Sequence, residues 1–599
     1  MQSKGRNHSL SCDNGNNEVN ATSINNTTSA VKNSGIKRKF IFITGGVMSG
    51  LGKGVVTSST AKLLQLAGFR VSCVKIDPYV NYDAGTMNPI AHGEVFVTDD
   101  GGECDMDVGN YERFLDLALT REHSLTTGRV YSGVIQAERE GRYLGQCVQI
   151  IPHVTDAIKG QLRKIAAKEE LDVTVVECGG TVGDIESLPF LEALRQMELE
   201  DGESNTLFIH VTLAPVLDVV GEQKTKPTQH SVQELRRIGI QPDILAIRCK
   251  TPLTAEARHK ISLFASVNED CVISCHDAPS IYKVPEVLAS QGMIKVIGKK
   301  LLLRKCSPKW GEWRSIAKSF YASTGLVKIA VVGKYATLPD SYVSVYHALS
   351  HAAAHIGKKV DIEWIESEKF ENGPSSRPND KGRKNIKNMN NNTNTNNLFY
   401  LKGFDGILIP GGFGKRGSEG IIRAANFARV QNVPYLGICF GFQLAIVGFG
   451  RYACGLEEAN STELDPSTKD PVVEFMPEQK TAHGAGGSMR LGSHEITIHS
   501  NTNAERIYKT DIIYRRHRHR YEFNQNYRKL LEKRGIVFSG HSDNGQRMEI
   551  LEIPEHKFYY AVQYHSEFNS RPGNPEQAFD AFVRASAASS TAAAGIIRS

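Results

Sequence analysis

The chain has 599 residues, which is too long for one domain and predicts two large domains with additional tails. Hydrophobic residues make up 40% and charged residues 23%, an ordinary globular composition, and a net charge of +6 does not by itself indicate nucleic-acid binding. The 11 cysteines contain no CxxC pair, so we expect reduced thiols in a cytoplasmic protein rather than a disulfide framework or zinc site. No run of 18 apolar residues occurs, so we expect no membrane span.

Four segments have compositions typical of tails, inserts or linkers. Residues 1–37 are rich in Asn and Ser without an apolar core, which predicts a disordered extension rather than a signal peptide. An Asn-rich stretch at about 373–397 predicts a surface loop insert, because lengthening a loop costs little extra closure entropy. We expect a linker at 307–325 and a flexible Ala/Ser-rich tail at 586–599.

The first motif is a glycine-rich turn between an apolar strand, Lys39–Thr44, and a predicted helix from about Val55 to Gly68. Glycines let backbone N–H groups approach phosphates and Lys53 adds a fixed positive charge, so the segment predicts a phosphate cradle. The match to the P-loop pattern is imperfect, because Val47 and Gly54 replace the first glycine and the Mg²⁺-binding hydroxyl residue. Taken alone, the turn is also compatible with a purely structural role.

Carboxylates follow at strand ends. The predicted strands Val71–Asp77 and Val173–Glu177 both end in acidic residues, and further acidic residues gather between Asp83 and Asp107. Ligands of open α/β sheets bind at the carboxyl ends of parallel strands. Asp107 and Glu177 carry the hard oxygen atoms that Mg²⁺ prefers, although any one of these residues is also compatible with a loop cap.

A lysine pair occupies a later loop. Lys224 and Lys226 lie in the Pro-containing segment Gly221–Ser231, and two closely spaced ammonium groups suit a polyphosphate. A solvated charged loop is the alternative interpretation of this segment taken alone.

The C-terminal half, which begins with the predicted strand Val327–Gly333, contains a nucleophile pattern. The strand Pro434–Ile438 is followed by Cys439 and a predicted helix, and a thiol at a helix start is favoured as a thiolate. Farther along, His565 and Glu567 follow an apolar strand and supply a base and the group that orients it. The three side chains together predict acyl transfer through a thioester, whereas Cys439 alone is more typical of a buried core.

A basic stretch, Arg516–Glu522, contains arginines and histidines in alternation. Without an enzymatic context it indicates an exposed patch for nucleic acid, but few aromatic residues are interleaved for stacking on bases. We expect no nucleic-acid partner.

These motifs carry a resemblance. The Cys439, His565 and Glu567 set, together with Pro410–Gly414, resembles the class I glutamine amidotransferases. From about residue 38 to about 585, apart from the Asn-rich insert, the chain resembles the CTP synthase family through an ordered series of motifs: Ser49–Gly54, Lys75–Tyr79, His92–Val97, Gly179–Ser187 and Lys224–Ser231.

The resemblance implies an α/β protein with two doubly wound, mostly parallel-sheet domains, an amidoligase at 38–306 and an amidotransferase at 326–585. It implies a C–N ligase that phosphorylates UTP with ATP and displaces the phosphate with ammonia released from L-glutamine. Mg²⁺ with ATP is the expected cofactor, without an organic prosthetic group.

The resemblance also implies ligand contacts. Lys53 joins the three amidotransferase residues as catalytic. ATP would contact Gly50, Leu51, Gly52, Lys53, Gly54, Val55, Asp107, His276, Asp277 and Ala278. UTP, and the feedback inhibitor CTP in an overlapping site, would contact Ser49, Asp184, Ile185, Glu186, Lys224, Thr225, Lys226, Pro227, Thr228, Gln229 and Lys260. Glutamine would contact Gly412, Phe440, Gly441, Phe442, Gln443, Glu463 and Arg520, and Mg²⁺ would be held by Asp107 and Glu177.

Regulation and assembly follow from the resemblance alone. GTP is the expected activator, with Phe413, Arg416 and Arg490 as candidate contacts, and a homotetramer with nucleotide sites between subunits is expected. Filament formation would be compatible with activity. Ammonia has to cross between the sites without meeting bulk water, and His92 is the candidate lining residue.

Three positions depart from the family pattern. Phe440 and Phe442 are bulkier than usual beside the nucleophile, and Ser566 replaces a common proline. We expect these differences to affect the rate of glutamine hydrolysis more than any other property.

Three alternatives stay open: another amide-forming ATP ligase such as a cobyrinate-type amidase, a partitioning-type ATPase switch and a filament-forming pseudoenzyme. The lysine pair favours UTP over the first alternative, and the complete set of catalytic side chains disfavours the other two.

Overall fold

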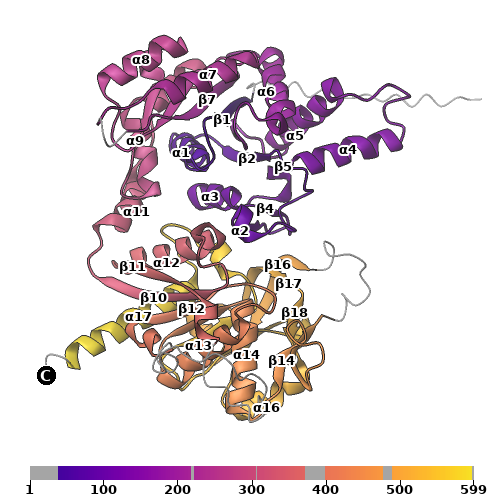
Figure 1. Cartoon of the computed structure of the whole chain (residues 1–599), viewed down its shortest axis with the longest axis vertical. Coiled ribbons are helices and arrows are strands. Elements are labelled where there is room, and N and C mark those ends of the chain that lie inside the picture. Colours follow the sequence, from indigo (N-terminus) through magenta and orange to yellow (C-terminus); the bar gives the residue numbers. More distant parts are fainter. Residues whose placement is uncertain (1–37, 217–220, 305–306, 372–397, 477–488, 597–599) are drawn as a thin grey trace, which may run out of the picture. The chain divides into compact units, whose positions relative to one another are not determined.

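The computed structural model describes residues 38–216, 221–304, 307–371, 398–476 and 489–596. The expected N-terminal extension and the Asn-rich insert lie outside these residues. The expected fold class is confirmed: each half is built on a sheet that is covered by helices (Figure 1).

The sheet of the N-terminal half is parallel throughout, in the order β5-β2-β6-β1-β7-β8-β9. Its strands are β1 (Lys39–Gly45), β2 (Val71–Asp77), β5 (Ser124–Thr126), β6 (Val173–Cys178), β7 (Thr206–Leu213), β8 (Ile244–Arg248) and β9 (Val272–Cys275). A hairpin of β3 (Val95–Val97) and β4 (Glu103–Asp105) follows β2. The strands are buried apolar runs, as parallel strands covered on both faces require.

Alternation along β1 divides this core into two layers. Ile41 and Ile43 face one cluster that includes Leu63 of α1, while Phe40 and Phe42 face the opposite cluster. The helices are α1 (Lys53–Leu66), α2 (Pro89–His92), α3 (Met106–Leu115), α4 (Thr127–Arg139), α5 (Thr155–Lys168), α6 (Leu188–Asp201), α7 (Lys226–Arg237), α8 (Ala255–Ala265), α9 (Val284–Ser290) and α10 (Met293–Lys300). Helix α1 begins two residues before its predicted start, which places Lys53 on its first turn.

The sheet of the C-terminal half has the order β11-β10-β12-β13-β21-β20-β19-β16-β17. The five strands from β11 to β21 are parallel, and the other four are joined by antiparallel pairings. Their bounds are β10 (Leu326–Gly333), β11 (Lys359–Glu366), β12 (Gly406–Ile409), β13 (Tyr435–Ile438), β16 (Arg490–Ile498), β17 (Ile512–His519), β19 (Val537–Ser542), β20 (Arg547–Glu552) and β21 (Tyr559–Val562). A small sheet contains β14 (Ala459–Ser461), β15 (Asp470–Phe475) and β18 (Tyr521–Phe523).

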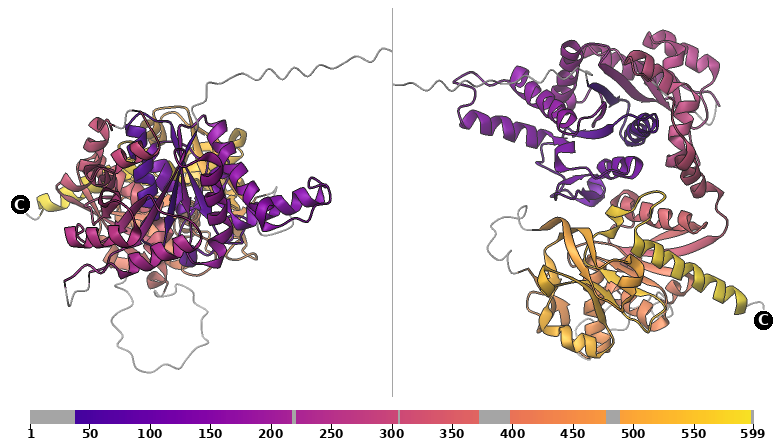
Figure 2. Two further views of the ribbon diagram at one scale, coloured as in Figure 1. Left: turned by 90° about the horizontal axis from the view of Figure 1, so that it is seen from above. Right: turned by 180° about the vertical axis from the view of Figure 1, so that it is seen from behind.

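Helices again cover both faces of the parallel block. One cluster packs α13 (Ser418–Gln431) and α14 (Phe440–Ala453), and the other packs α12 (Val343–His355) and α17 (Gln577–Ile596), which runs toward the C-terminus (Figure 2). The short helices are α15 (Asn503–Tyr508) and α16 (Arg528–Lys533). Helix α17 covers most of the expected flexible tail, since its Ala-rich sequence has a high helix propensity.

The expected linker contains a helix, α11 (Gly311–Ala322). Its buried residues, Trp313 and Ala317, are four positions apart and therefore lie on one helix face. The Trp313 ring packs against Phe114 and Tyr282, and its Nε1 donates a hydrogen bond to the Tyr282 carbonyl at 3.1 Å. The connection is thus anchored on the N-terminal half.

Replacing Trp313 with alanine would leave a cavity beneath α11. We expect Trp313→Ala to destabilise the N-terminal half by about 3 kcal/mol. Scanning calorimetry would show a lowered thermal midpoint, whereas the exposed Lys318→Ala on the same helix should leave it unchanged. Equal midpoints for the two variants would contradict an anchoring role for this helix.

Candidate active site

Cys439, the candidate nucleophile, lies on a sharp turn between β13 and α14. Cys439 has φ 51° and ψ −96°, a conformation that non-glycine residues rarely adopt and that persists at functional turns. Gly441 is required there, since a Cβ atom would lie 2.3 Å from the Ile409 carbonyl oxygen. The Cys439 thiol therefore stands at the N-terminus of α14, where free N–H groups favour negative charge.

The other two catalytic candidates meet Cys439 as expected. His565 Nδ1 lies 2.6 Å from Glu567 Oε1, and a side-chain hydrogen bond links His565 to Cys439. Gly411 is close to the ring, because a Cβ atom on it would lie 2.7 Å from His565 Cε1. Gln563 Nε2 lies 3.7 Å from Cys439 Sγ.

Electrostatics stabilise a charged imidazole. Burial disfavours the imidazolium of His565, but the charges of Glu567 and Cys439 and its hydrogen bonds to both outweigh burial and raise the pKa of His565 to about 10. A thiolate beside an imidazolium is the reactive form of a cysteine nucleophile. The geometry therefore suits attack on an amide carbonyl carbon.

The three side chains open on a cavity of about 450 Å³. Four of the expected glutamine contacts line it: Gly412, Gln443, Glu463 and Arg520. Its size suits a small ligand, and Glu463 and Arg520 offer charges of both signs for an amino acid. The backbone N–H of Gly414 donates to Glu463 Oε1 at 2.6 Å. This bond connects the loop Pro410–Gly414, called the glycine loop below, to the cavity wall at Glu463.

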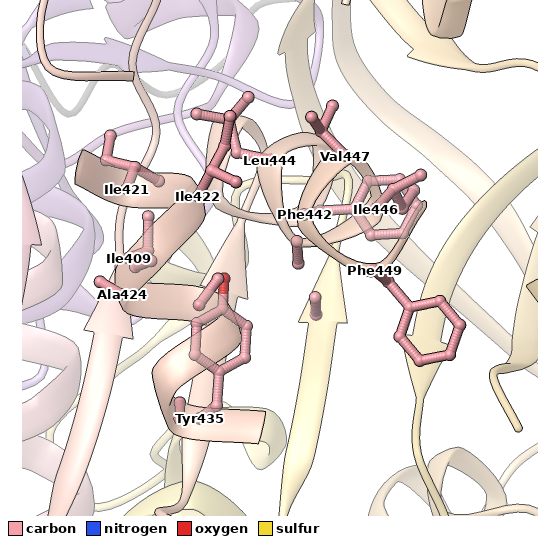
Figure 3. Packing of buried hydrophobic residues seen from close by; sticks show 14 of the residues in the cluster. Ile409, Ile421, Ile422, Ala424, Tyr435, Phe442, Leu444, Ile446, Val447 and Phe449 are labelled. Atoms are coloured by element: carbon pink, nitrogen blue, oxygen red, sulfur yellow. The ribbon is translucent and has the colours of Figure 1, made fainter. Parts of the chain in front are cut away.

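The side chains of Phe440 and Phe442 do not line the cavity, so any contact of these residues with glutamine would come from their backbone. Phe442 is fully buried in the apolar cluster around α14 (Figure 3), because helix periodicity turns it away from the thiol. Phe440 lies under the Lys334 ammonium, 4.5 Å from the ring centroid. Gly441 serves the turn rather than the cavity wall. The expected crowding of the nucleophile by these rings does not occur.

The far wall of the cavity comes from the N-terminal half, through Gly85, Thr86, Met87, Pro89, Glu94 and Val95. The buried Glu94 carboxylate accepts hydrogen bonds from the Ser344 backbone N–H at 3.2 Å and from its hydroxyl at 2.5 Å. It thereby caps α12 of the other half. Burial raises the pKa of Glu94 to about 7. His92, the candidate lining residue of the ammonia passage, does not line this cavity and lies edge-on to the Tyr79 ring.

The phosphate cradle forms at the carboxyl end of β1. Gly50 and Gly52 have φ angles of 75° and 88°, and Val47, at the consensus glycine position, has φ 77°. Lys53 Nζ donates to the Gly180 carbonyl at 2.8 Å. A Cβ atom on Gly54 would lie 2.0 Å from Asp107 Oδ1, so the carboxylate occupies the place of the missing hydroxyl.

Buried carboxylates surround one lysine beside this loop. Lys75 Nζ contacts Asp107, and it lies 3.3 Å from Asp105, 3.4 Å from Glu177 and 3.7 Å from Asp77. Burial alone would lower the pKa of Lys75, but these carboxylates raise it well above its usual value. Burial raises the pKa of Glu177, with a further contribution from the charge of Asp107.

The charge around Asp107 and Glu177 suits Mg²⁺. Four carboxylates face the single Lys75 ammonium, so a further positive charge would offset the repulsion between them. Within the described ranges, no group of three or more His, Cys, Asp and Glu side chains is arranged to hold a metal. Mg²⁺ commonly takes one or two carboxylates and completes its shell with phosphate oxygens and water. The site thus fits the ion together with a bound nucleotide.

The expected pyrimidine-nucleotide contacts differ in burial, and Lys224 and Pro227 are half-buried. Ser49, Asp184, Ile185, Glu186, Lys226 and Lys260 are exposed, whereas Thr225, Thr228 and Gln229 are buried. Thr228 Oγ1 bonds Thr212 Oγ1 at 2.9 Å and Gln229 Nε2 donates to Thr225 Oγ1 at 3.1 Å, so these three side chains hold the fold instead. Lys224 pairs with Glu222 at 2.6 Å, and the exposed Lys226 stands at the N-terminus of α7, which suits a phosphate.

Two of the expected adenine contacts interact with other residues of the N-terminal half. His276 Nδ1 lies 3.3 Å from Ser274 Oγ, and Asp277 pairs with Arg248 at 2.6 Å. Among the GTP candidates, Phe413 is 54% exposed, whereas Arg490 is buried against Glu549 at 2.6 Å and is not available.

Sequence reasoning missed His210, which lies beneath the phosphate loop. Its ring nitrogens bond Thr44 at 2.8 Å and Ser231 at 2.7 Å, which links β1, β7 and α7. Burial, with the nearby Lys53 charge, lowers the pKa of His210 to about 3, so the ring is neutral. A histidine inside an apolar strand was the available signal.

The basic stretch at 516–522 is not an exposed patch, and the nucleic-acid interpretation of it is wrong. Arg516, His517 and His519 are buried in β17 and at its end. Arg516 pairs with Glu112, and Arg518 with Glu103 at 2.8 Å, both in the N-terminal half. The arginines join the two halves.

Two sequence families match the chain. Residues 39–303 match the family described as CTP synthase N-terminus, and residues 337–585 match glutamine amidotransferase class-I. In the described part of the chain, no helix is long and apolar enough to cross a bilayer.

Curated relatives match nearly along their whole length. The CTP synthase of Thermococcus gammatolerans is 52% identical over 548 residues, which cover 91% of this chain and 98% of the relative. The CTP synthases of Pyrococcus furiosus and Methanococcoides burtonii are 52% and 49% identical and also cover 91% of the chain, with 97% and 98% of their own lengths matched. With its synthetase and amidotransferase halves both matched, the chain belongs to the CTP synthase family.

Proposed function

We propose that the chain converts UTP, ATP, L-glutamine and water into CTP, ADP, phosphate and glutamate. The observation that carries the proposal is the cavity at Cys439, whose far wall belongs to the half with the phosphate cradle. A thiol that cleaves an amide inside such a cavity delivers ammonia directly to the synthetase half. We call the halves amidotransferase and synthetase below.

Glutamine cleavage follows from the chemistry of the cavity. Arg520 and Glu463 bind the substrate carboxylate and ammonium, and Cys439 Sγ attacks the carboxamide carbon. The N–H of Phe440, on the first turn of α14, has no partner in the helix and can stabilise the oxyanion. His565 gives its proton to the departing ammonia and then accepts one from water, which hydrolyses the thioester.

Phosphoryl transfer takes place at the other half. The β1–α1 loop and Lys53 hold the ATP phosphates, and the lysine neutralises charge that develops on the transferred group. The uracil O4 of UTP accepts that phosphoryl group, and ammonia then displaces it from C4. Bound Mg²⁺, held by Asp107 and Glu177, supplies charge neutralisation on the phosphates.

Further proposals concern regulation, assembly and location. GTP would activate through Phe413 and Arg416, whose side chains flank Tyr335 beside the glycine loop, and CTP would inhibit in a site that overlaps that of UTP. Exposed apolar residues around α4, such as Ile135 and Leu144, support a homotetramer. A cytoplasmic location is supported by the described cysteines, all of them free thiols.

The decisive test separates the two nitrogen sources. With ATP, Mg²⁺ and UTP, we expect wild type to form CTP from either glutamine or ammonium chloride, and Cys439→Ala from ammonium alone. The measurement is the absorbance change as UTP becomes CTP. If the wild type hydrolyses glutamine but neither source yields CTP, UTP is not the acceptor and another amide-forming ligase is favoured.

The raised pKa of His565 predicts a pH dependence. Its imidazolium persists through neutral pH and is lost as the pH rises toward about 10. Glu567→Gln removes the charge that raises this pKa most, so the imidazolium is lost at lower pH. Glutamate release should then fall more steeply from about pH 7 to about pH 9 than in wild type. The exposed Glu457→Gln is the control, and an unshifted alkaline limb for Glu567→Gln would refute the assignment.

Metal removal should separate the two reactions. Chelation with EDTA is expected to stop CTP formation from ammonium while glutamate release without nucleotides continues. Asp107→Asn should raise the Mg²⁺ concentration for half-maximal CTP formation by at least about tenfold. Asp201→Asn, in a surface ion pair with Arg163, should not change it. Equal Mg²⁺ dependence for both variants would remove Asp107 from the metal site.

A further inference from the structure

A buried ionic cluster joins the two halves around one carboxylate. Glu112 of α3 is fully buried, and it accepts two parallel hydrogen bonds from Arg516, at 2.9 and 3.1 Å, and one from Arg571 at 2.6 Å. Arg516 Nε also donates to Asp99 at 2.6 Å. Both arginines belong to the amidotransferase half, and both carboxylates belong to the synthetase half.

Arg516 is linked to the catalytic histidine by one backbone hydrogen bond. Its backbone carbonyl accepts the His565 backbone N–H at 2.8 Å. Two residues farther along β17, the Arg518 carbonyl lies 3.7 Å from Cys439 Sγ. The backbone of β17 thus contacts the His565 backbone and the Cys439 thiol, while its Arg516 side chain is held by Glu112.

The same helix reaches the nucleotide site. Asp107, beside the phosphate loop, lies on the first turn of α3, five residues before Glu112. A helix rises 1.5 Å per residue, so about 7 Å of hydrogen-bonded helix separates the two carboxylates. Aromatic contacts support the joint, because Phe96 packs against Phe568 with ring centroids 5.0 Å apart.

The chemistry of the cluster favours a positioning role over a purely stabilising one. A buried ion pair contributes little net stability, but the removal of one partner leaves uncompensated charge. Arg516 forms a bidentate pair with Glu112, which fixes the orientation of its guanidinium as well as its position. The carbonyl that holds His565 is attached to that fixed side chain.

We propose that Glu112 is a positioning residue for glutamine cleavage, supplied by the synthetase half, which makes the rate of that cleavage respond to nucleotide bound beside Asp107. This inference rests on the proposed function. Nucleotide binding shifts α3, Glu112 carries the shift to Arg516, and β17 aligns His565 with Cys439.

The experiment compares glutamate release with and without ATP, Mg²⁺ and UTP in wild type, Glu112→Gln and Asp116→Asn. Asp116 is the matched control: it lies at the end of α3, 3.9 Å from Arg571, and the contacts of the ionic cluster to Arg516 do not include it. CTP formation from ammonium is measured in parallel, because it needs the synthetase half but not the alignment of His565. Where Glu112→Gln does not fold, Glu112→Asp keeps the charge and shortens the reach.

We expect nucleotides to raise kcat for glutamate release in wild type and Asp116→Asn by about tenfold, and to have little effect in Glu112→Gln, with KM for glutamine unchanged. CTP formation from ammonium should persist in all three proteins, and its absence in wild type would count against the proposed function instead. Preserved nucleotide stimulation in Glu112→Gln, or no stimulation in wild type, would overturn the inference. A parallel loss of CTP formation from ammonium would reduce Glu112 to a structural residue.

Discussion

A carboxylate taken out of water needs a compensating positive charge, and every working part of this protein is organised around that requirement. In the synthetase half, Lys75 compensates the carboxylates beside the phosphate loop. In the amidotransferase half, Glu567 is compensated by an imidazolium. Between the halves, Glu112 is compensated by two arginines. Because these groups are buried, small displacements change their energies strongly, which makes them suitable for positioning reacting atoms.

The shared cavity adds close backbone contacts to these charge pairs. Glycines at 411 and 441 allow the backbone to approach the imidazole and the β12 strand, so that the thiol opens on the wall formed by the synthetase half. Glu94 then closes that wall by capping α12. The two reactions are therefore joined by a surface that neither half could provide alone, and a released neutral molecule meets side chains of both.

The sequence predicted what depends on local patterns. The strands β1 and β2 and the turn at Cys439 followed from apolar runs and glycine spacing, and residue type indicated that His565 and Glu567 lie with Cys439. What it could not predict depends on long-range contacts. Nothing near Arg516 indicated that Glu112, far earlier in the chain, neutralises it, so the stretch was compatible with an exposed patch. Similarly, Phe442 was expected beside glutamine, but helix periodicity places its side chain in the core. The partners of His210, Thr44 and Ser231, lie in other segments of the chain and could not be identified from the sequence around it.

The contact between Gly54 and Asp107 has a consequence for how this phosphate loop can change. A serine or threonine at position 54 would bring a side chain into the space that the Asp107 carboxylate already fills, 2.0 Å from where its Cβ would be. The aspartate in turn has room only because position 54 is bare. A hydroxyl residue at position 54 would therefore displace the carboxylate that we propose to hold Mg²⁺, so the standard P-loop hydroxyl and this aspartate exclude each other from the same space.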